Sequence, residues 1–192
     1  MDAYEQLVAD LGYLPSKFAK FAESLDYILG HYGPVEATRV YHILDSGFGW
    51  GISSVMLLRR YPEASVTCID PYWPGTYSDA RPVMDYQPTI IRRRWTFIRG
   101  RLEDIGQPGV EIFPPAVDLV MLDADHNYPS TLYQLEAVYP RIRKGGLLIC
   151  HDVKEGVPVL RAIEEFELAH HIHFERWPGF DDCGWAWLRK GA

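Results

Sequence analysis

Short apolar segments alternate with amphipathic segments along most of the chain. The apolar segments end at turn or polar signals, as buried strands do, and lie at 40–44, 65–69, 95–98, 117–122 and 147–150. Between them, apolar residues recur at helical spacing from residue 52, over about 129–143 and over about 157–169. Strands alternating with helices predict a parallel α/β sheet with right-handed crossovers, so the carboxyl ends of the strands share one edge.

The two ends of the chain depart from this alternation. Residues 173–177 and 184–189 flank a turn at Pro178-Gly179, which predicts a hairpin and therefore an antiparallel last strand. Residues 1–37 carry leucines and aromatic residues at helical spacing, interrupted by Gly12 and Pro15. We therefore expect a helical N-terminal extension over 1–37 and one domain over 38–192.

A turn with alternating glycines follows the first predicted strand. Gly47, Gly49 and Gly51 lack Cβ atoms where the backbone turns, and the helix that follows presents unpaired N–H groups. This arrangement favours a nucleotide or nucleoside ligand. A dinucleotide-binding turn carries its third glycine at the position of Ile52, so pyrophosphate binding is disfavoured.

Acidic and imidazole side chains follow the other predicted strands. Asp70 ends the second strand about 20 residues after the glycine turn, where an acid accepts the ribose hydroxyls of a nucleoside, although a turn or helix-capping aspartate is the alternative. His126 and His151 are candidates for a general base, because imidazole titrates near neutral pH. Asp123 and Asp152 end neighbouring strands and are candidate Mg²⁺ ligands. Alternatively, Asp152 caps the following helix and Asp125 binds the ligand or water.

Composition narrows the class of protein. The 192 residues suit one sizeable core, and a net charge of −7 argues against a nucleic-acid partner. The three cysteines are far apart and indicate no disulfide framework. With an acidic start and no long apolar run, we expect a cytoplasmic protein without a membrane segment.

These motifs, in this order, resemble the class I S-adenosylmethionine-dependent methyltransferases, within the macrocin-type small-molecule O-methyltransferases. The resemblance covers roughly residues 38–190. The stretch from Asp45 to Gly51 is similar to the family's acid-x-G-x-G-x-G motif, and 123–128, 144–146 and 151–152 are similar to its D-x-D-H-x-Y, K/P-G-G and H-D signatures. The resemblance implies a Rossmann-like seven-stranded sheet, mostly parallel with an antiparallel C-terminal strand, and helices on both faces.

The resemblance also implies a role for each motif. Asp45 faces the ammonium group of the donor, directly or through water, and His126 is the base. Arg101 stands where the family usually has an acid that contacts the adenine, and Val153 stands where related metal-dependent enzymes often have Asn. Whether Mg²⁺ is required therefore stays open. The implied donor-binding residues are Asp45, Ser46, Gly47, Phe48, Gly49, Gly51, Asp70, Pro71, Arg101, Leu102 and Asp123, and the implied catalytic residues are His126, Asp123 and Asp152.

Two rival functions remain at this point. A NAD-dependent oxidoreductase would share the strand, glycine turn and acid, but Ile52 and the terminal hairpin disfavour it. A catalytically silent nucleoside-binding module would share the fold, because a fold does not guarantee chemistry. The expected partner is a small-molecule acceptor, flat or glycosidic if the aromatic residues of 71–94 line its site. The alternatives for this segment are a lid or a dimer contact, and the chain could form a homo-oligomer.

Overall fold

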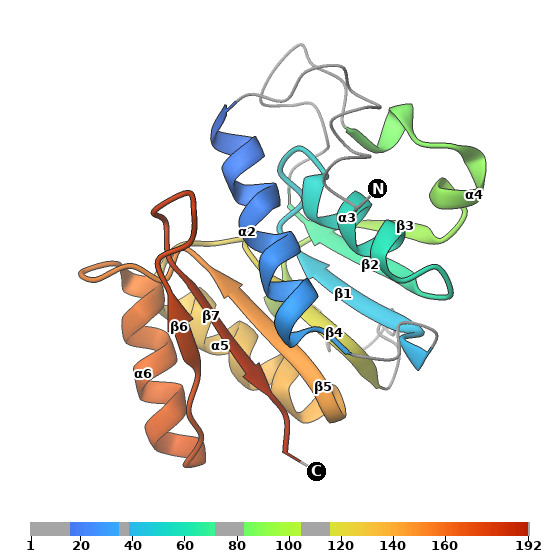
Figure 1. Cartoon of the computed structure of the whole chain (residues 1–192). Helices are drawn as coiled ribbons and strands as arrows, with labels where there is room; N and C mark the ends of the chain where they lie inside the picture. The colour runs from blue at the N-terminus through green and yellow to red at the C-terminus, as the bar shows by residue number, and fades with distance from the viewer. Residues whose placement is uncertain (1–15, 35–38, 72–82, 105–115, 192) are drawn as a thin grey trace.

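The computed structural model describes residues 16–34, 39–71, 83–104 and 116–191 (Figure 1). Its sheet has the strand order β3-β2-β1-β4-β5-β7-β6. The strands are β1 (His42–Ser46), β2 (Ser65–Asp70), β3 (Trp95–Arg99), β4 (Val117–Leu122), β5 (Ile142–His151), β6 (Glu175–Trp177) and β7 (Trp185–Arg189). Neighbours from β3 to β5 are parallel, and β7 is antiparallel to both β5 and β6. The predicted α/β sheet with an antiparallel last strand is confirmed.

The order of the strands places a crevice beside β1. From β1 the chain moves outward through β2 to β3, then returns to the other side of β1 as β4. At such a reversal the segments that follow the two strands diverge, which opens a ligand site at their carboxyl ends. Backbone hydrogen bonds hold the rim of this crevice: Gly47 N–H donates to Ile69 O at 2.9 Å, and Asp123 N–H donates to Ser46 O at 2.7 Å.

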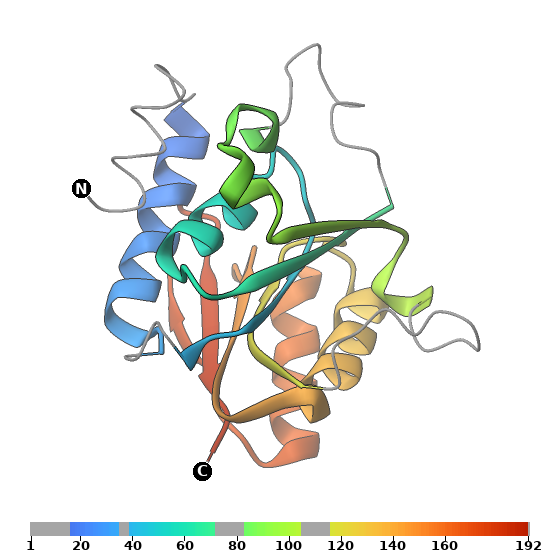
Figure 2. The same ribbon diagram turned by 90° about the vertical axis from the view of Figure 1, so that its right-hand side faces the viewer.

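Helices cover both faces of the sheet, as predicted, and Figures 1 and 2 show the two layers from perpendicular directions. α2 and α3 lie on one face, and α5 and α6 lie on the other. The helices and helical turns are α2 (Ser16–Tyr32), α3 (Ile52–Arg60), η2 (Val83–Tyr86), α4 (Thr89–Arg92), η3 (Leu102–Asp104), α5 (Tyr128–Val138), η4 (Tyr139–Arg141) and α6 (Pro158–His170).

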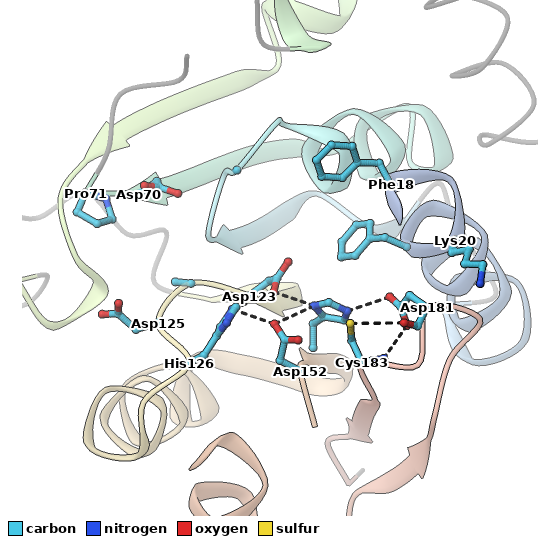
Figure 3. Close-up of a pocket in the computed structure, with 14 residues that line it drawn as sticks. Phe18, Lys20, Asp70, Pro71, Asp123, Asp125, His126, Asp152, Asp181 and Cys183 are labelled. Atoms are coloured by element: carbon cyan, nitrogen blue, oxygen red, sulfur yellow. Dashed lines mark hydrogen bonds and ion pairs between the residues drawn. The ribbon is translucent and has the colours of Figure 1, made fainter. Parts of the chain in front are cut away.

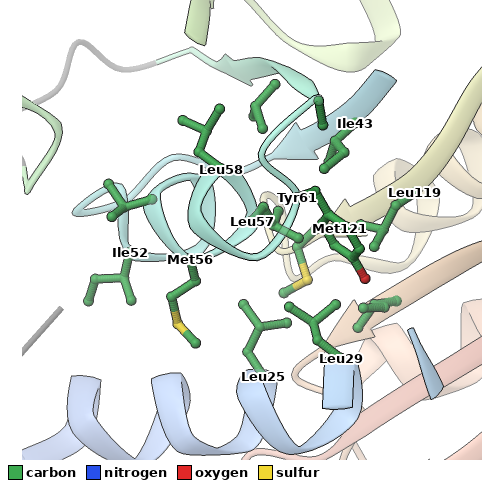
Figure 4. Close-up of a cluster of buried hydrophobic side chains, with 14 of the residues drawn as sticks. Leu25, Leu29, Ile43, Ile52, Met56, Leu57, Leu58, Tyr61, Leu119 and Met121 are labelled. Carbon is green, nitrogen blue, oxygen red and sulfur yellow. The ribbon is translucent and has the colours of Figure 1, made fainter. Parts of the chain in front are cut away.

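Alternate residues of the central strands build the two halves of the core. Ile43 joins the cluster under α2 and α3, whereas Leu44 joins the cluster under α5 and α6. Successive side chains of a strand point to opposite faces, so a strand buried on both faces needs apolar residues at nearly every position. Figure 4 shows Leu25 and Leu29 of α2 beside Met56 of α3 and Tyr61.

One predicted boundary is wrong. The helix expected over 129–143 ends at Val138, and β5 begins at Ile142 rather than at Leu147. Pro140 lacks the N–H that a continuing α-helix needs, and a single helical turn leads into the strand. Gly145, with φ +77°, lies in a stretch where the β4–β5 register shifts, so the glycine pair marks an irregularity inside the strand.

α2 is the described part of the expected helical extension, and residues 1–15 of that extension lie outside the described residues. The Arg189 side chain ties the end of this helix to the sheet: it donates to the carbonyl oxygens of Tyr32 and Gly33, and to Gly145 O at 2.9 Å. In the described part of the chain, no helix is both long and apolar enough to cross a membrane. Much of the aromatic segment 71–94, namely 72–82, also lies outside the described residues.

Candidate active site

The glycine turn after β1 is held in backbone conformations that L-residues rarely adopt. Gly47, Gly49 and Gly51 have φ of +102°, +47° and +80°. A Cβ on Gly47 would lie 2.1 Å from the carbonyl oxygen of Asp123, well inside a van der Waals contact. The turn can therefore approach the end of β4 only with glycine at position 47.

Asp70 joins the glycine turn to the end of β2. Its Oδ2 atom accepts the backbone N–H of Phe48 at 2.7 Å, and the carboxylate lines the cavity described below. Asp70 is thus part of the turn's own architecture as well as a candidate for binding a ribose.

Asp45 lies beneath the turn and is fully buried. Its Oδ2 atom accepts hydrogen bonds from the Ser53 hydroxyl at 2.8 Å and the Ser54 hydroxyl at 2.5 Å, whereas Oδ1 has no hydrogen-bond partner among the described residues. Burial raises the pKa of Asp45 to about 7, against the lowering effect of the two serines. A buried carboxylate oxygen without a partner is costly, so a cation or hydrogen-bond donor beside it would be favoured.

A cavity of about 650 Å³ opens at the carboxyl edge of the sheet (Figure 3). Its size is within the range of pockets for small molecules. Gly49, Asp70 and Pro71 line one end. The other walls come from the segments after β4 and β5, from α2 and from the β6–β7 loop, and consist of Phe18, Lys20, Phe21, Asp123, Ala124, Asp125, His126, His151, Asp152, Asp181 and Cys183.

His126 bridges two carboxylates in this cavity. Its Nε2 atom is 2.9 Å from Asp152 Oδ2 and 3.6 Å from Asp123 Oδ1. Hydrogen bonds to Asp123 and Asp152 raise the pKa of His126 to about 10, so the ligand-free site holds an imidazolium at neutral pH. Asp152 has φ +58°, and it does not cap α6, whose N-cap residue is Val157. The capping alternative for Asp152 is therefore wrong.

His151 lies deeper in the same cluster. Its Nδ1 atom is 2.9 Å from Asp123 Oδ1 and its Nε2 atom is 3.0 Å from Asp181 Oδ2. The ring packs edge-on against Phe21, with centroids 5.0 Å apart, and lies 4.4 Å from the Trp185 ring. Burial alone would lower the pKa of His151, but the charge of Asp123 and hydrogen bonds to the aspartates raise it to about 12.

The two histidines in turn act on the carboxylates. Burial would raise the pKa of Asp123 and of Asp152, but the charge of His151 and hydrogen bonds from His126 and His151 hold both values below the ordinary one. Both carboxylates are therefore ionised near neutral pH. Together with His126 they form a group whose candidate ligand atoms all lie within 4.8 Å of one another, which fits a divalent cation bound mainly by oxygen.

Several of the predicted donor-binding residues do not line the cavity, namely Asp45, Ser46, Gly47, Phe48, Gly51, Arg101 and Leu102. Leu102 is 2% exposed and packs in the core under α5. Arg101 lies outside the cavity wall, with its guanidinium 3.7 Å from Asp125. Ser46 lies below the turn, where its hydroxyl donates to Gln134 at 3.0 Å.

Sequence reasoning missed one side of the cavity. Phe18 and Phe21 were expected as residues of a helical extension that either packs on the core or covers a pocket, with nothing in the sequence to decide between the two, and Asp181 and Cys183 were assigned no role. For Asp181 a signal existed: β6 runs in the same direction as β5, so the loop after it returns to the edge that carries the other acids.

Comparisons with known proteins identify a family and a fold. A family model described as a methyltransferase domain matches residues 44–153, more than half of the chain. The O-methyltransferase TomG from Streptomyces achromogenes, solved with S-adenosylmethionine, is 15% identical, with a TM-score of 0.60 over 100% of this chain and 91% of TomG. CalS11, a TDP-rhamnose 3′-O-methyltransferase, is 16% identical, with a TM-score of 0.59 over 99% of this chain and 93% of CalS11.

A further solved structure is larger than this chain. The MycE methyltransferase of the mycinamycin pathway, in complex with Mg, S-adenosylhomocysteine and mycinamycin VI, is 15% identical, with a TM-score of 0.64. The match covers 100% of this chain but 55% of MycE, so the chain spans about half of that protein's length. At these identities the likeness shows the fold. No curated protein matches the sequence significantly.

Proposed function

The chain belongs to the methyltransferase-domain family, and from that membership we propose that it transfers the methyl group of S-adenosylmethionine to a hydroxyl group of a small molecule. The observation that carries the proposal is a single cavity shared by two sets of residues. Gly49 and Asp70, at one end, are suited to a nucleoside donor, and His126 with its two carboxylates is suited to a hydroxyl. A methyl transfer requires donor and acceptor in one enclosed space, held in line.

The donor-binding side fits a methyl donor that carries a positive charge. Asp45 is buried and does not line the cavity, but its Oδ1 atom has no hydrogen-bond partner among the described residues and would receive the ammonium group of the donor's methionine part, directly or through water. Asp70 would accept the ribose hydroxyls, and the absence of a Cβ at Gly47 leaves the turn close to the end of β4. The donor supplies an electrophilic methyl group when bound.

His126 is the proposed general base. As the acceptor oxygen attacks the methyl group its O–H bond must break, and an imidazole at hydrogen-bond distance can take the proton. The carboxylates of Asp123 and Asp152 would hold Mg²⁺, whose charge lowers the pKa of a bound hydroxyl and offsets the negative charge that keeps a proton on His126. MycE was solved with Mg, which supports testing this ion first.

The acceptor side of the cavity has an aromatic wall. Phe18 of α2 lies across the cavity from His126 (Figure 3), and Phe21 of the same helix lines the cavity beside His151. Flat apolar faces opposite a polar cluster suit an acceptor with a broad apolar face and a hydroxyl at its edge. MycE was solved with mycinamycin VI, and CalS11 is a TDP-rhamnose 3′-O-methyltransferase, which supports a small-molecule acceptor here.

Ligand binding, followed by turnover, tests the proposal. We expect S-adenosylhomocysteine to raise the melting temperature of the full chain and NAD to leave it unchanged, and we expect methyl transfer to one member of a panel of phenols, sugars and macrolides, read by mass spectrometry. Stabilisation by NAD alone would favour the oxidoreductase. Binding of S-adenosylhomocysteine with no transfer across the panel would favour the silent nucleoside-binding module.

Chelation distinguishes a mechanism that requires Mg²⁺ from one that uses His126 without a metal. If Mg²⁺ at Asp123 and Asp152 is required, exhaustive treatment with EDTA abolishes methyl transfer and added Mg²⁺ restores it. Activity that survives chelation would leave His126 and the carboxylates as the complete acid–base machinery and exclude the metal.

Three further expectations are part of the same proposal. The division into an extension over 1–37 and a catalytic domain over 38–192, a cytoplasmic location, and the lack of a nucleic-acid partner are each open to direct test. Light scattering of the purified chain would give the oligomeric state.

A further inference from the structure

We propose that His151, Asp181 and Cys183 form a binding site for a thiophilic transition-metal ion, with Zn²⁺ as the reference ion, at the acceptor end of the cavity. The three side chains offer one imidazole nitrogen, one carboxylate oxygen and one sulfur, and these atoms all lie within 4.8 Å of one another. Zn²⁺ binds this mixture of ligands in proteins, whereas Mg²⁺ prefers oxygen ligands.

The orientation of the His151 ring is the first support. Its Nδ1 atom lies 2.9 Å from Asp123 Oδ1, and its Nε2 atom points at Asp181 Oδ2, 3.0 Å away. Histidines that bind metals almost always donate the N–H of the other ring nitrogen to a carboxylate or carbonyl. Asp123 therefore fixes the ring so that Nε2 is directed at Asp181, and the Cys183 sulfur lies within 4.8 Å of the ligand atoms of both residues.

Asp181 is also held in place for this role. Its Oδ1 atom accepts the indole N–H of Trp185 at 3.1 Å and the backbone N–H of Cys183 at 3.3 Å, so Oδ2 is turned toward His151. The Asp181 side chain is only 6% exposed, and Trp185 is fully buried. A carboxylate fixed by two donors loses little conformational freedom when it binds an ion.

The site is open toward the cavity and distinct from the Asp123–His126–Asp152 group. All three ligand residues line the cavity (Figure 3), so three protein ligands would leave a fourth position for water or an acceptor atom. The His151 ring separates the two groups, because Nδ1 faces Asp123 and Nε2 faces Asp181.

Zn²⁺ binding should release two protons from the site. The Cys183 thiol gives up its proton as the sulfur–metal bond forms, and the proton between His151 Nε2 and Asp181 Oδ2 leaves as both atoms become ligands. Both protons pass to solvent, and no oxidation or reduction is involved. Zinc binding should therefore acidify a weakly buffered solution.

Cobalt titration tests the site directly. The untagged full chain, in excess Mg²⁺, is titrated with Co²⁺ and with Zn²⁺ in competition with a chromophoric chelator. We expect a near-ultraviolet thiolate-to-cobalt charge-transfer band that Zn²⁺ displaces. In Cys183→Ser the band disappears, and the Zn²⁺ affinity falls at least about tenfold. Trp185→Phe, which keeps a ring but lacks the N–H, lowers the affinity about tenfold through Asp181.

Matched variants decide the location of the ion. Asp181→Asn should weaken Zn²⁺ binding, whereas Asp182→Asn changes a neighbouring carboxylate outside the group and should not. Zinc affinity that falls in Asp152→Asn but not in Cys183→Ser would put the ion in the other group and overturn the proposal. So would a cobalt spectrum without a thiolate band. Binding of S-adenosylhomocysteine, measured in parallel, reports on the proposed methyltransferase function independently.

Discussion

At the scale of single residues, two histidines pair with three aspartates in the cavity. His126 lies between Asp123 and Asp152, and His151 lies between Asp123 and Asp181. The sequence placed the first group at one edge because each residue follows a predicted strand. For Asp181 the predicted hairpin indicates the same edge, but it does not fix the path of the β6–β7 loop, which decides where the side chain points.

Replacing His126 tests its role as a base. We expect His126→Ala to lower kcat by about 10²- to 10⁴-fold, the usual contribution of a general base, with the affinity for S-adenosylhomocysteine unchanged. The matched control is His173→Ala, which removes a histidine whose side chain is 79% exposed and paired with Glu167 on the surface. A kcat for His126→Ala equal to that of the control would remove His126 from the mechanism.

The buried carboxylate of Asp45 should make stability depend on pH. Its pKa is about 7 in the folded protein and about 3.9 when unfolded, so the folded state binds the extra proton between these values. The stabilising contribution of this proton is complete below pH 4, falls by up to about 1.4 kcal/mol per pH unit, and is lost once the pH exceeds 7.

The Asp45→Asn variant should lack the pH-dependent contribution to stability that the Asp45 proton makes. In urea unfolding of the ligand-free protein, the variant gains stability relative to the native chain from pH 4 to pH 7, and the difference then levels off. The same change should weaken S-adenosylhomocysteine binding, because a neutral amide replaces the carboxylate. Parallel pH profiles for the two proteins would contradict a raised pKa at Asp45.

At the scale of elements, the turn between β1 and α3 was the most predictable part of the site. Three alternating glycines predict a tight turn, because glycine readily adopts the positive φ values that other residues avoid. All three glycines do have positive φ. The end of α5 was less predictable. Apolar residues continue through Tyr139 and Ile142, and periodicity alone does not show that the chain changes from helix to strand between them.

A methyl group at position 47 should break the turn. In Gly47→Ala the new Cβ would meet the Asp123 carbonyl at 2.1 Å with φ at +102°, so we expect a loss of at least about 2–3 kcal/mol in the free energy of unfolding and no donor binding. The control is Gly30→Ala in α2, where a Cβ meets nothing within 4 Å and should add about 0.5–1 kcal/mol. Denaturant unfolding and calorimetry measure both effects.

The aromatic wall of α2 should act on the acceptor rather than on the donor. We expect Phe21→Ala to raise the acceptor KM up to about tenfold, through the loss of aromatic contact, with S-adenosylhomocysteine affinity retained. Leu168→Ala, at a residue 78% exposed on α6, serves as the control. If donor affinity falls and the acceptor KM does not change, α2 contacts the donor instead.

At the scale of the whole molecule, the family match confirms the resemblance to class I methyltransferases that the ordered motifs indicated. The parallel direction of the central strands follows from the alternation of elements, and the antiparallel last strand follows from the terminal hairpin. The Rossmann-like seven-stranded sheet was implied by the family resemblance, and the strand order comes from the structure. The packing of α2 across the carboxyl edge was not visible, because an apolar helical stripe does not specify its partner. Its position depends on contacts between residues far apart in the chain, such as Phe21 with Trp185.

Arg189 makes long-range contacts of this kind, and its contribution to stability can be tested by itself. Removing its hydrogen bonds to the Tyr32, Gly33 and Gly145 carbonyls in Arg189→Ala should cost about 1 kcal/mol of unfolding free energy and speed hydrogen exchange at the end of α2. Arg189→Lys keeps the charge but not the planar group of donors, so it should recover part of the loss. Equal exchange rates in all three proteins would show that α2 is held by its apolar face alone.

The residues that line the cavity come from different parts of the chain. Gly49, Asp70 and the His126 cluster belong to the matched segment 44–153, whereas Phe18, Lys20, Phe21, Asp181 and Cys183 lie outside it. Variant libraries confined to α2 and the β6–β7 loop should therefore redirect the enzyme to new acceptors without rebuilding its donor site. Grafting these two segments from a relative offers the same route to an altered product.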